Sequence, residues 1–136
     1  MTKLVAVYGT LKRGFGNHRV MQMDNGQYFA SGRTKTAWTM YGGYGYPRVV
    51  EQVREDGVGV KVEVFECDSV DNMDRLEGHP RFFQRKPVVI QLEPPFPVEA
   101  GETGTVEAWM YFHPPLEEGQ GQIEEDGEWK GGKGAF

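Results

Sequence analysis

The sequence predicts a small α+β domain in which short strands outnumber helices. Its 136 residues fit one domain, since most domains contain about 100 to 150 residues. Its 19 glycines and eight prolines are typical of tight turns and disfavour a helical bundle. Apolar and polar residues alternate in several segments, which indicates about seven short strands, and a single segment has well-marked helix boundaries.

Continuous apolar runs mark one group of expected strands. Residues 4–8 and 88–92 are rich in β-forming residues without alternation, as is typical of strands covered on both faces. Residues 37–41 and 48–50 are weaker runs of the same kind. We expect a strand at each of these positions.

Alternating residues mark the clearest strands. Valines at every second position between residues 58 and 64 place four apolar side chains on one face of a half-buried strand. Residues 105–112 have an apolar side and an amphipathic side, and we expect this strand close to the functional site. The glycine-rich segment 42–47 and the proline-rich segment 93–97 are expected turns or loops, because glycine relaxes φ and proline cannot donate to a sheet.

One helix is expected over residues 69–77. Asp68 or Ser69 can serve as its N-cap, Gly78 is a typical C-terminal residue, and Pro80 prevents its continuation. Both ends of this helix are therefore predicted from local residue types.

A carboxylate lies on the apolar face of this helix. At roughly 100° per residue, Glu77 falls inside the stripe formed by Val70, Met73 and Leu76. A carboxylate that faces a core requires a partner or a raised pKa, and such groups recur as general acids and bases. Alternatively, the side chain turns to solvent or pairs with Arg81 or Arg85. The helical pattern leaves both interpretations open.

A glycine-bracketed loop at residues 9–16 follows the first expected strand. A phosphate-binding loop would need GxxxxGK[ST], but Gly14 is followed here by Phe15 and Gly16. The loop is then either a nest of main-chain donors for an anion or oxyanion, or an ordinary tight turn.

The sequence does not predict a metal site or a nucleophilic side chain. His18, His79 and His113 lack metal-ligand spacing, and the single cysteine excludes a CxxC motif. Cys67 ends the valine-rich strand, and we expect a buried structural thiol there.

Charge and hydropathy restrict the partners. The net charge of −5 and the pI of 5.2 argue against nucleic-acid binding, because such domains often have a pI above about 9. No apolar run approaches the roughly 18 residues that span a bilayer, so we expect no membrane insertion. No secretory signal is recognised at the N-terminus, and we expect a cytoplasmic protein.

The composition changes after residue 115. Residues 116–136 contain six acids, two lysines and six glycines, and they carry −4 of the net charge. We therefore predict a domain at 1–115 followed by an acidic, glycine-rich tail at 116–136 that is mobile or loosely draped. The alternative is that Ile123, Trp129 or Phe136 anchors the tail.

Two separated motifs resemble a known family. The chain contains VYGTLKRG at 7–14, MDRLEGHP at 73–80, then Arg85 and the late strand AWMY at 108–111. In this order they resemble the γ-glutamylcyclotransferase-like (AIG2-like) family over about residues 3–113, and the start is most similar to the γ-glutamylamine cyclotransferase branch. The resemblance implies a small mixed β-barrel with short flanking helices, and no cofactor or metal.

The resemblance also implies roles for individual residues. Glu77 matches the family's catalytic acid/base, and Tyr111 matches a late-strand tyrosine near the pocket. The family's substrate loop, whose backbone holds the glutamyl group, corresponds to Tyr8, Gly9, Thr10 and Leu11. Phe83 stands where the family usually has a tyrosine, so one hydroxyl is missing.

The implied reaction releases 5-oxoproline and a free amine from a γ-glutamyl amine or γ-glutamyl amino acid. The substrate's own α-amine attacks, so its partner is a small γ-glutamyl molecule, and we expect a monomer or a small homo-oligomer. The competing interpretation is a non-catalytic module that binds a glutamyl-like metabolite or a protein partner, because a fold does not guarantee its chemistry.

Overall fold

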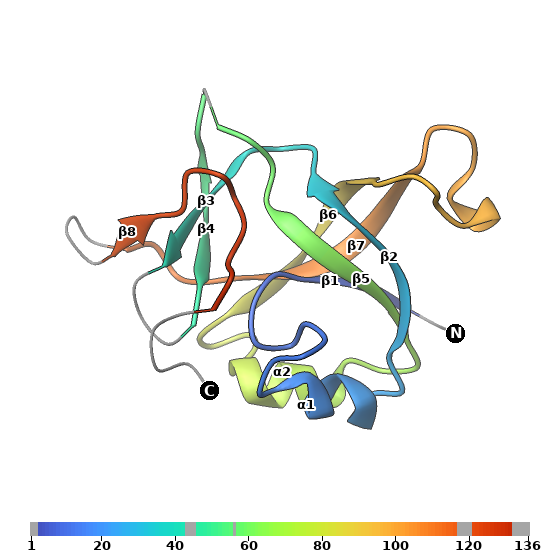
Figure 1. Ribbon diagram of the computed structural model, residues 1–136. Helices are drawn as coiled ribbons and strands as arrows, with labels where there is room; N and C mark the ends of the chain where they lie inside the picture. The colour runs from blue at the N-terminus through green and yellow to red at the C-terminus, as the bar shows by residue number, and fades with distance from the viewer. Residues whose placement is uncertain (1–2, 43–45, 56, 117–120, 132–136) are drawn as a thin grey trace.

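The computed structural model describes residues 3–42, 46–55, 57–116 and 121–131. Within these residues it contains eight strands, two α-helices and one 3₁₀ helix (Figure 1). In chain order they are β1 (Lys3–Val7), α1 (His18–Met23), β2 (Gln27–Thr34), β3 (Trp38–Gly42), β4 (Arg48–Val53), β5 (Lys61–Cys67), α2 (Asp71–Glu77), β6 (Gln84–Leu92), η1 (Val98–Ala100), β7 (Thr105–Phe112) and β8 (Gln122–Ile123).

Five strands form a closed mixed barrel, which confirms the expected fold class. Their order is β1-β5-β2-β6-β7, and the barrel closes where β1 pairs with β7 in parallel through Val5 and Trp109. The other pairs of neighbours are antiparallel. Closure leaves no unpaired edge in this sheet. A second sheet has the order β4-β3-β8 and lies beside the barrel (Figure 1).

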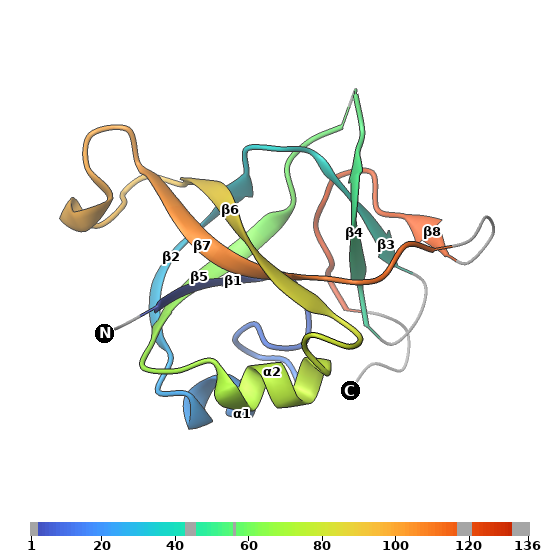
Figure 2. The same ribbon diagram turned by 180° about the vertical axis from the view of Figure 1, so that it is seen from behind.

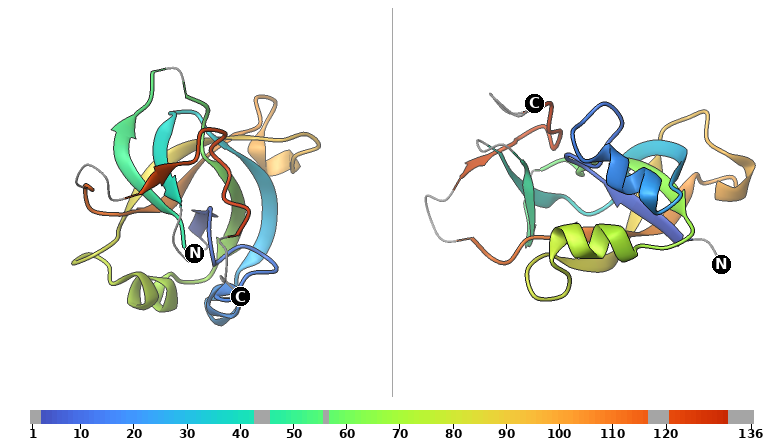
Figure 3. Two further views of the ribbon diagram at one scale, coloured as in Figure 1. Left: turned by 60° about the vertical axis from the view of Figure 1, so that its left-hand side comes forward. Right: turned by 90° about the horizontal axis from the view of Figure 1, so that it is seen from below.

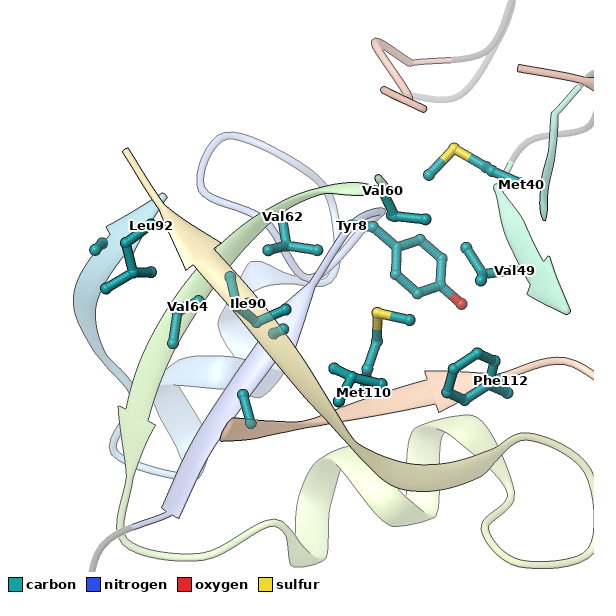
Figure 4. Close-up of a cluster of buried hydrophobic side chains, with 14 of the residues drawn as sticks. Tyr8, Met40, Val49, Val60, Val62, Val64, Ile90, Leu92, Met110 and Phe112 are labelled. Atoms are coloured by element: carbon teal, nitrogen blue, oxygen red, sulfur yellow. The ribbon is translucent and has the colours of Figure 1, made fainter. Parts of the chain in front are cut away.

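The barrel interior is filled by side chains at alternate strand positions. Val60, Val62 and Val64 are fully buried there, together with residues from every other barrel strand (Figure 4). The prediction that a fourth valine, Val58, lies on the same buried face is wrong, because Val58 is 47% exposed and precedes β5. The chain departs from the ladder at Gly59, where the carbonyl of Thr34 lies too close for any side chain.

Helices α1 and α2 lie next to each other against the outside of the barrel (Figures 1 and 3). They cover the outer residues of β1, so Val5 and Val7 belong to a second apolar cluster with Met21 and Met73. This confirms that β1 is covered on both faces. The same prediction is wrong for β6, where Val89 is 45% exposed because its outward face has no helix over it (Figure 2).

Helix α2 begins later than predicted. It starts at Asp71, and neither Asp68 nor Ser69 is its N-cap; Val70 holds that position without a side-chain cap. The buried carboxylate of Asp24, at the end of α1, instead accepts hydrogen bonds from the N–H groups of Asn72 and Met73 at 3.2 and 3.0 Å. Capping thus comes from a residue far away in the sequence. The predicted end at Glu77 and Gly78 is confirmed, with φ of 72° at Gly78.

The described part of the C-terminal segment, residues 121–131, packs on the domain. Strand β8 pairs with β3, and Trp129 is 2% exposed within the core of the barrel. Ile123 is 44% exposed, while Phe136 lies outside the described residues. This packing favours the anchored alternative through Trp129. The division into a domain at 1–115 and a separate tail stays a prediction.

The two expected turn segments differ in outcome. Residues 93–97 contain no strand or helix, as expected. Of the turn expected at 42–47, Gly42 belongs instead to strand β3, and residues 43–45 lie outside the described residues. None of the helices in the described segments has the length and apolar character needed to cross a membrane.

Candidate active site

A cavity of about 390 Å³ lies where the loop after β1 meets the end of α2. All six residues predicted for the site line this cavity: Tyr8, Gly9, Thr10, Leu11, Glu77 and Tyr111. The loop and the helix are on the same side of the barrel (Figure 1). The fold therefore brings the two separated sequence motifs to one place.

The loop at residues 9–16 forms the first wall and offers main-chain donors. Lys12 N–H donates to the Gly9 carbonyl at 3.0 Å, and Asn17 holds Thr10 through its backbone and its side-chain amide. Within the described segments, the N–H groups of Gly9, Thr10 and Leu11 donate to no other protein atom. Such groups in a fixed turn can bind a carboxylate or an oxyanion.

Glu77 forms the second wall. It is the last residue of α2, and its side chain is half-buried. No hydrogen bond or ion pair to its carboxylate is found among the described residues, so neither Arg81 nor Arg85 pairs with it. Burial raises the pKa of Glu77 to about 7. A carboxyl group with this pKa can both accept and return a proton near neutral pH.

Arg85 pairs with Asp74 instead. Its guanidinium donates from Nε to Asp74 Oδ1 at 2.9 Å and from a terminal nitrogen to Oδ2 at 3.2 Å. The hydroxyl of Tyr111 also donates to Asp74 Oδ1, at 2.5 Å. These bonds tie α2 to β6 and β7, one turn before Glu77. Sequence reasoning missed this role of Asp74, although Asp74 and Arg85 both lie in the quoted motifs.

The two tyrosines of the site are fixed to the barrel. Tyr8 points into the interior among apolar side chains and donates its hydroxyl to the Tyr111 carbonyl at 2.7 Å (Figure 4). Burial raises the pKa of both phenols, so both stay neutral at physiological pH. Tyr8 and Tyr111 thus shape the cavity, while Glu77 is its one carboxylate among the described lining residues.

Phe83 and Cys67, which the sequence analysis singled out, are both buried in the structure. Phe83 lines the cavity, is 7% exposed, and contacts Phe82 and His113 edge to face. Cys67 is fully buried, which confirms the expected structural thiol, and burial raises the pKa of its thiol to about 12. The histidines, acids and cysteine that the structure describes form no group of three able to hold a metal ion.

Comparisons with known proteins identify the family. A barrel cavity that combines main-chain donors with a half-buried carboxylate is a site for a small molecule. The sequence matches the family described as "Gamma-glutamyl cyclotransferase, AIG2-like" over residues 5–131. The chain belongs to this family.

Two relatives are similar over most of their length. A Methanocaldococcus jannaschii protein named "Putative gamma-glutamylcyclotransferase" is 36% identical over 96% of this chain and 98% of that protein. A Drosophila melanogaster protein with the same name is 31% identical over 82% of this chain and 70% of that protein. Both names support the enzyme class at the level of the family.

Solved structures show the same fold. An AIG2-like protein from Mus musculus superimposes with a TM-score of 0.76 at 22% identity, covering 95% of this chain and 88% of that one. A protein specific to uropathogenic E. coli gives a TM-score of 0.71 at 20% identity, covering 96% and 94%. At these identities the likeness concerns the fold alone.

Proposed function

We propose that this protein cleaves γ-glutamyl amides by intramolecular cyclisation, releasing 5-oxoproline and a free amine. The α-amine of the substrate attacks its own γ-carbonyl carbon, a C–N bond forms, and the original amide C–N bond breaks. An amine held close to its carbonyl can reach an effective molarity of about 10⁵ to 10⁸ M. The reaction then needs no nucleophile from the protein.

The observation that carries this proposal is the unpartnered Glu77 carboxylate in the cavity. With a pKa of about 7, it takes a proton from the substrate α-ammonium and delivers it to the departing nitrogen. The lactam nitrogen keeps one of the three ammonium protons, so a second proton follows the same route through Glu77 after the ring closes, and the amine departs as an ammonium. The free N–H groups of Gly9, Thr10 and Leu11 bind the substrate carboxylate or the oxyanion that develops on the γ-carbonyl.

The buried thiol supports the same chemistry. Cys67 is fully buried, lies outside the cavity lining and has a thiol pKa of about 12, so the attacking thiolate would be scarce at neutral pH. Attack by the substrate's own amine fits the described residues better.

Three parallel incubations followed by mass spectrometry test the reaction. We expect 5-oxoproline from a γ-glutamyl amide, none from its α-linked isomer, and none from the γ-amide whose α-amine is acetylated. Turnover of the acetylated compound would mean that water or a side chain attacks, and the protein would then be a hydrolase.

A non-catalytic binding module is the second candidate, and Phe83 favours it by removing a hydroxyl from the cavity. Titration calorimetry separates the two functions. Binding of the γ-glutamyl amide without release of any product would support the module and contradict the proposed enzyme.

A further inference from the structure

The outer part of the cavity is lined by exposed apolar side chains. Tyr46, Leu76 and Phe82, here called the apolar rim, line the cavity and are 45%, 43% and 47% exposed. Large apolar side chains grouped at the mouth of a pocket are typical of a ligand-binding surface. The proton transfers proposed for Glu77 do not use them.

Charged groups are scarce around this rim. Among the described residues that line the cavity, Glu77 alone is an acid or a base of the Asp, Glu, Lys, Arg or His type. Its carboxylate is already assigned to the α-ammonium of the glutamyl group. A charged substituent on the departing amine, such as a carboxylate, would lose hydration against the rim without gaining an ion partner. This loss of hydration is unfavourable.

The apolar surface continues beyond the rim. Phe82 also borders a second cavity of about 540 Å³, whose other lining residues include Val50, Phe112 and Pro114. The ring of Phe82 is held edge to face against Phe83 at 5.1 Å and His113 at 5.0 Å. Two charged residues, Glu51 and Arg81, also line this second cavity, and Glu51 pairs with Lys86. A group that extends past Glu77 toward Phe82 therefore first meets the aromatic and aliphatic carbon of the rim.

We propose that the apolar rim binds the departing amine, and that the preferred substrates are γ-glutamyl amides whose amine part is apolar and carries no charged substituent, such as arylalkylamides. This inference rests on the proposed function and specifies its substrate class. Phe82 is the main selectivity residue, because it is exposed, aromatic, fixed by its neighbours and shared by both cavities.

A matched pair of substrates tests the charge requirement. γ-Glutamyl-phenethylamide and γ-glutamyl-phenylalanine differ by one carboxylate on the departing amine. We expect at least a tenfold higher kcat/KM for the phenethylamide, and a value for γ-glutamyl-ethylamide that is also about tenfold or more below it because the ring contact is lost. Equal or faster turnover of γ-glutamyl-phenylalanine would overturn the inference and would point to Arg81, which borders the second cavity.

A variant locates the contact. In Phe82→Ala we expect kcat/KM for the phenethylamide to fall about tenfold or more, while the value for the ethylamide changes by less than about twofold. Val98→Ala is the control, since Val98 is 92% exposed on η1 and lies outside both cavities. An equal loss on both substrates in Phe82→Ala would contradict a leaving-group contact.

Failure of the inference differs from failure of the proposed function. If no γ-glutamyl amide releases 5-oxoproline, the proposed function is wrong. Calorimetry with the same amides still tests the rim, because tighter binding of the phenethylamide than of γ-glutamyl-phenylalanine is expected with or without turnover. The reverse order of affinities would overturn it.

Discussion

The two walls of the cavity use different parts of the polypeptide. The loop at residues 9–16 contributes main-chain N–H groups, whereas α2 contributes one side chain, Glu77. A main-chain wall tolerates many side-chain changes but responds to any shift of the backbone. A side-chain wall can be removed by a single substitution that leaves the backbone in place. Mutational sensitivity should therefore differ between them.

The supports of the two walls differ as well. The loop rests on the C-terminal segment: Lys12 Nζ donates to the Trp129 carbonyl at 2.8 Å, and Phe15 packs on the Trp129 ring at 5.1 Å. Figures 1 and 2 both show this segment passing next to the loop. Helix α2 is held instead by the Asp24 carboxylate at its start and by its own Asp74, which binds Arg85 and Tyr111. Each wall thus depends on a residue outside the quoted motifs, Trp129 for the loop and Asp24 for the helix.

The largest effect on stability is expected at the support of the loop. Trp129→Ala removes a fully buried ring, and truncations of this kind cost about 3–5 kcal/mol. We expect a strong drop in melting temperature by calorimetry. Ile123→Ala, in the same segment but 44% exposed, is the control and should melt close to the wild type. A Trp129→Ala protein as stable as the wild type would instead support the loosely attached tail predicted from composition.

Removal of the side-chain wall should give the largest loss of activity. Glu77→Gln keeps the shape of the side chain but cannot accept the proton, so we expect turnover to fall by about 100-fold or more while the protein stays folded. Release of 5-oxoproline measures this. Glu107→Gln, an exposed change on β7, should retain full activity. Near-normal turnover in Glu77→Gln would exclude the proton-transfer role.

The support of α2 gives an intermediate effect. The Asp24 carboxylate accepts four hydrogen bonds, from Ser69, from the backbone and side chain of Asn72, and from Met73. Asp24→Asn replaces one acceptor oxygen with a donor, and we expect a loss of about 2 kcal/mol, seen as a drop of roughly 6–8 °C in melting temperature. The exposed Asp68→Asn should change it little. Equal effects of the two changes would contradict capping by Asp24.

A small backbone shift tests the main-chain wall. A Cβ on Gly9 would lie 2.7 Å from Cγ of Pro47, so Gly9→Ala must displace the loop or Pro47, and both line the cavity. We expect kcat/KM to fall about tenfold, because small misplacements of binding groups are costly. Gly14→Ala is the comparison: it strains a residue with φ of 87° in the same loop but meets no neighbour. Its kcat/KM should fall less, and the opposite order would mean that the position of Gly9 is not critical.

Local patterns predicted the parts of each wall that depend on neighbours in the sequence. Glu77 lies at the end of a helix as predicted, because Gly78 is a local signal. The predicted apolar stripe is buried at Val70 and Met73 but wrong at Leu76, which is 43% exposed. Strand β7 follows the same logic, with Ala108 and Met110 buried as the alternation requires.

The missed elements lack such local signals. Helix α1 has six residues, no side-chain cap and no acid in its first turn. Strand β2 contains Gly32, which weakens a strand pattern but is required where the carbonyl of Gln91 in β6 approaches closely. Capping of α2 by Asp24 depends on the packing of α1 against α2, which exists only in the folded chain. The site motifs are therefore visible in the sequence, whereas the capping by Asp24 is not.

The smallest expected effect is the pH dependence of stability that Glu77 causes. Its folded-state pKa of about 7 lies above the ordinary value of 4.5, so the folded protein holds this proton more tightly than the unfolded chain. The associated stability is fully present below about pH 4.5 and is lost as the pH rises through about 7. Tyr8 and Tyr111 face the same carboxylate but stay neutral in this range, since the pKa of both phenols is raised.

Urea denaturation of the wild type and of Glu77→Gln at pH 4.5 and pH 8 isolates the effect, because the variant keeps every other titrating group. We expect the wild type to lose stability relative to the variant at the higher pH. A constant difference between the two proteins would show that Glu77 titrates as an ordinary exposed carboxylate, and the side-chain wall would then lack the property on which its proposed proton transfer depends.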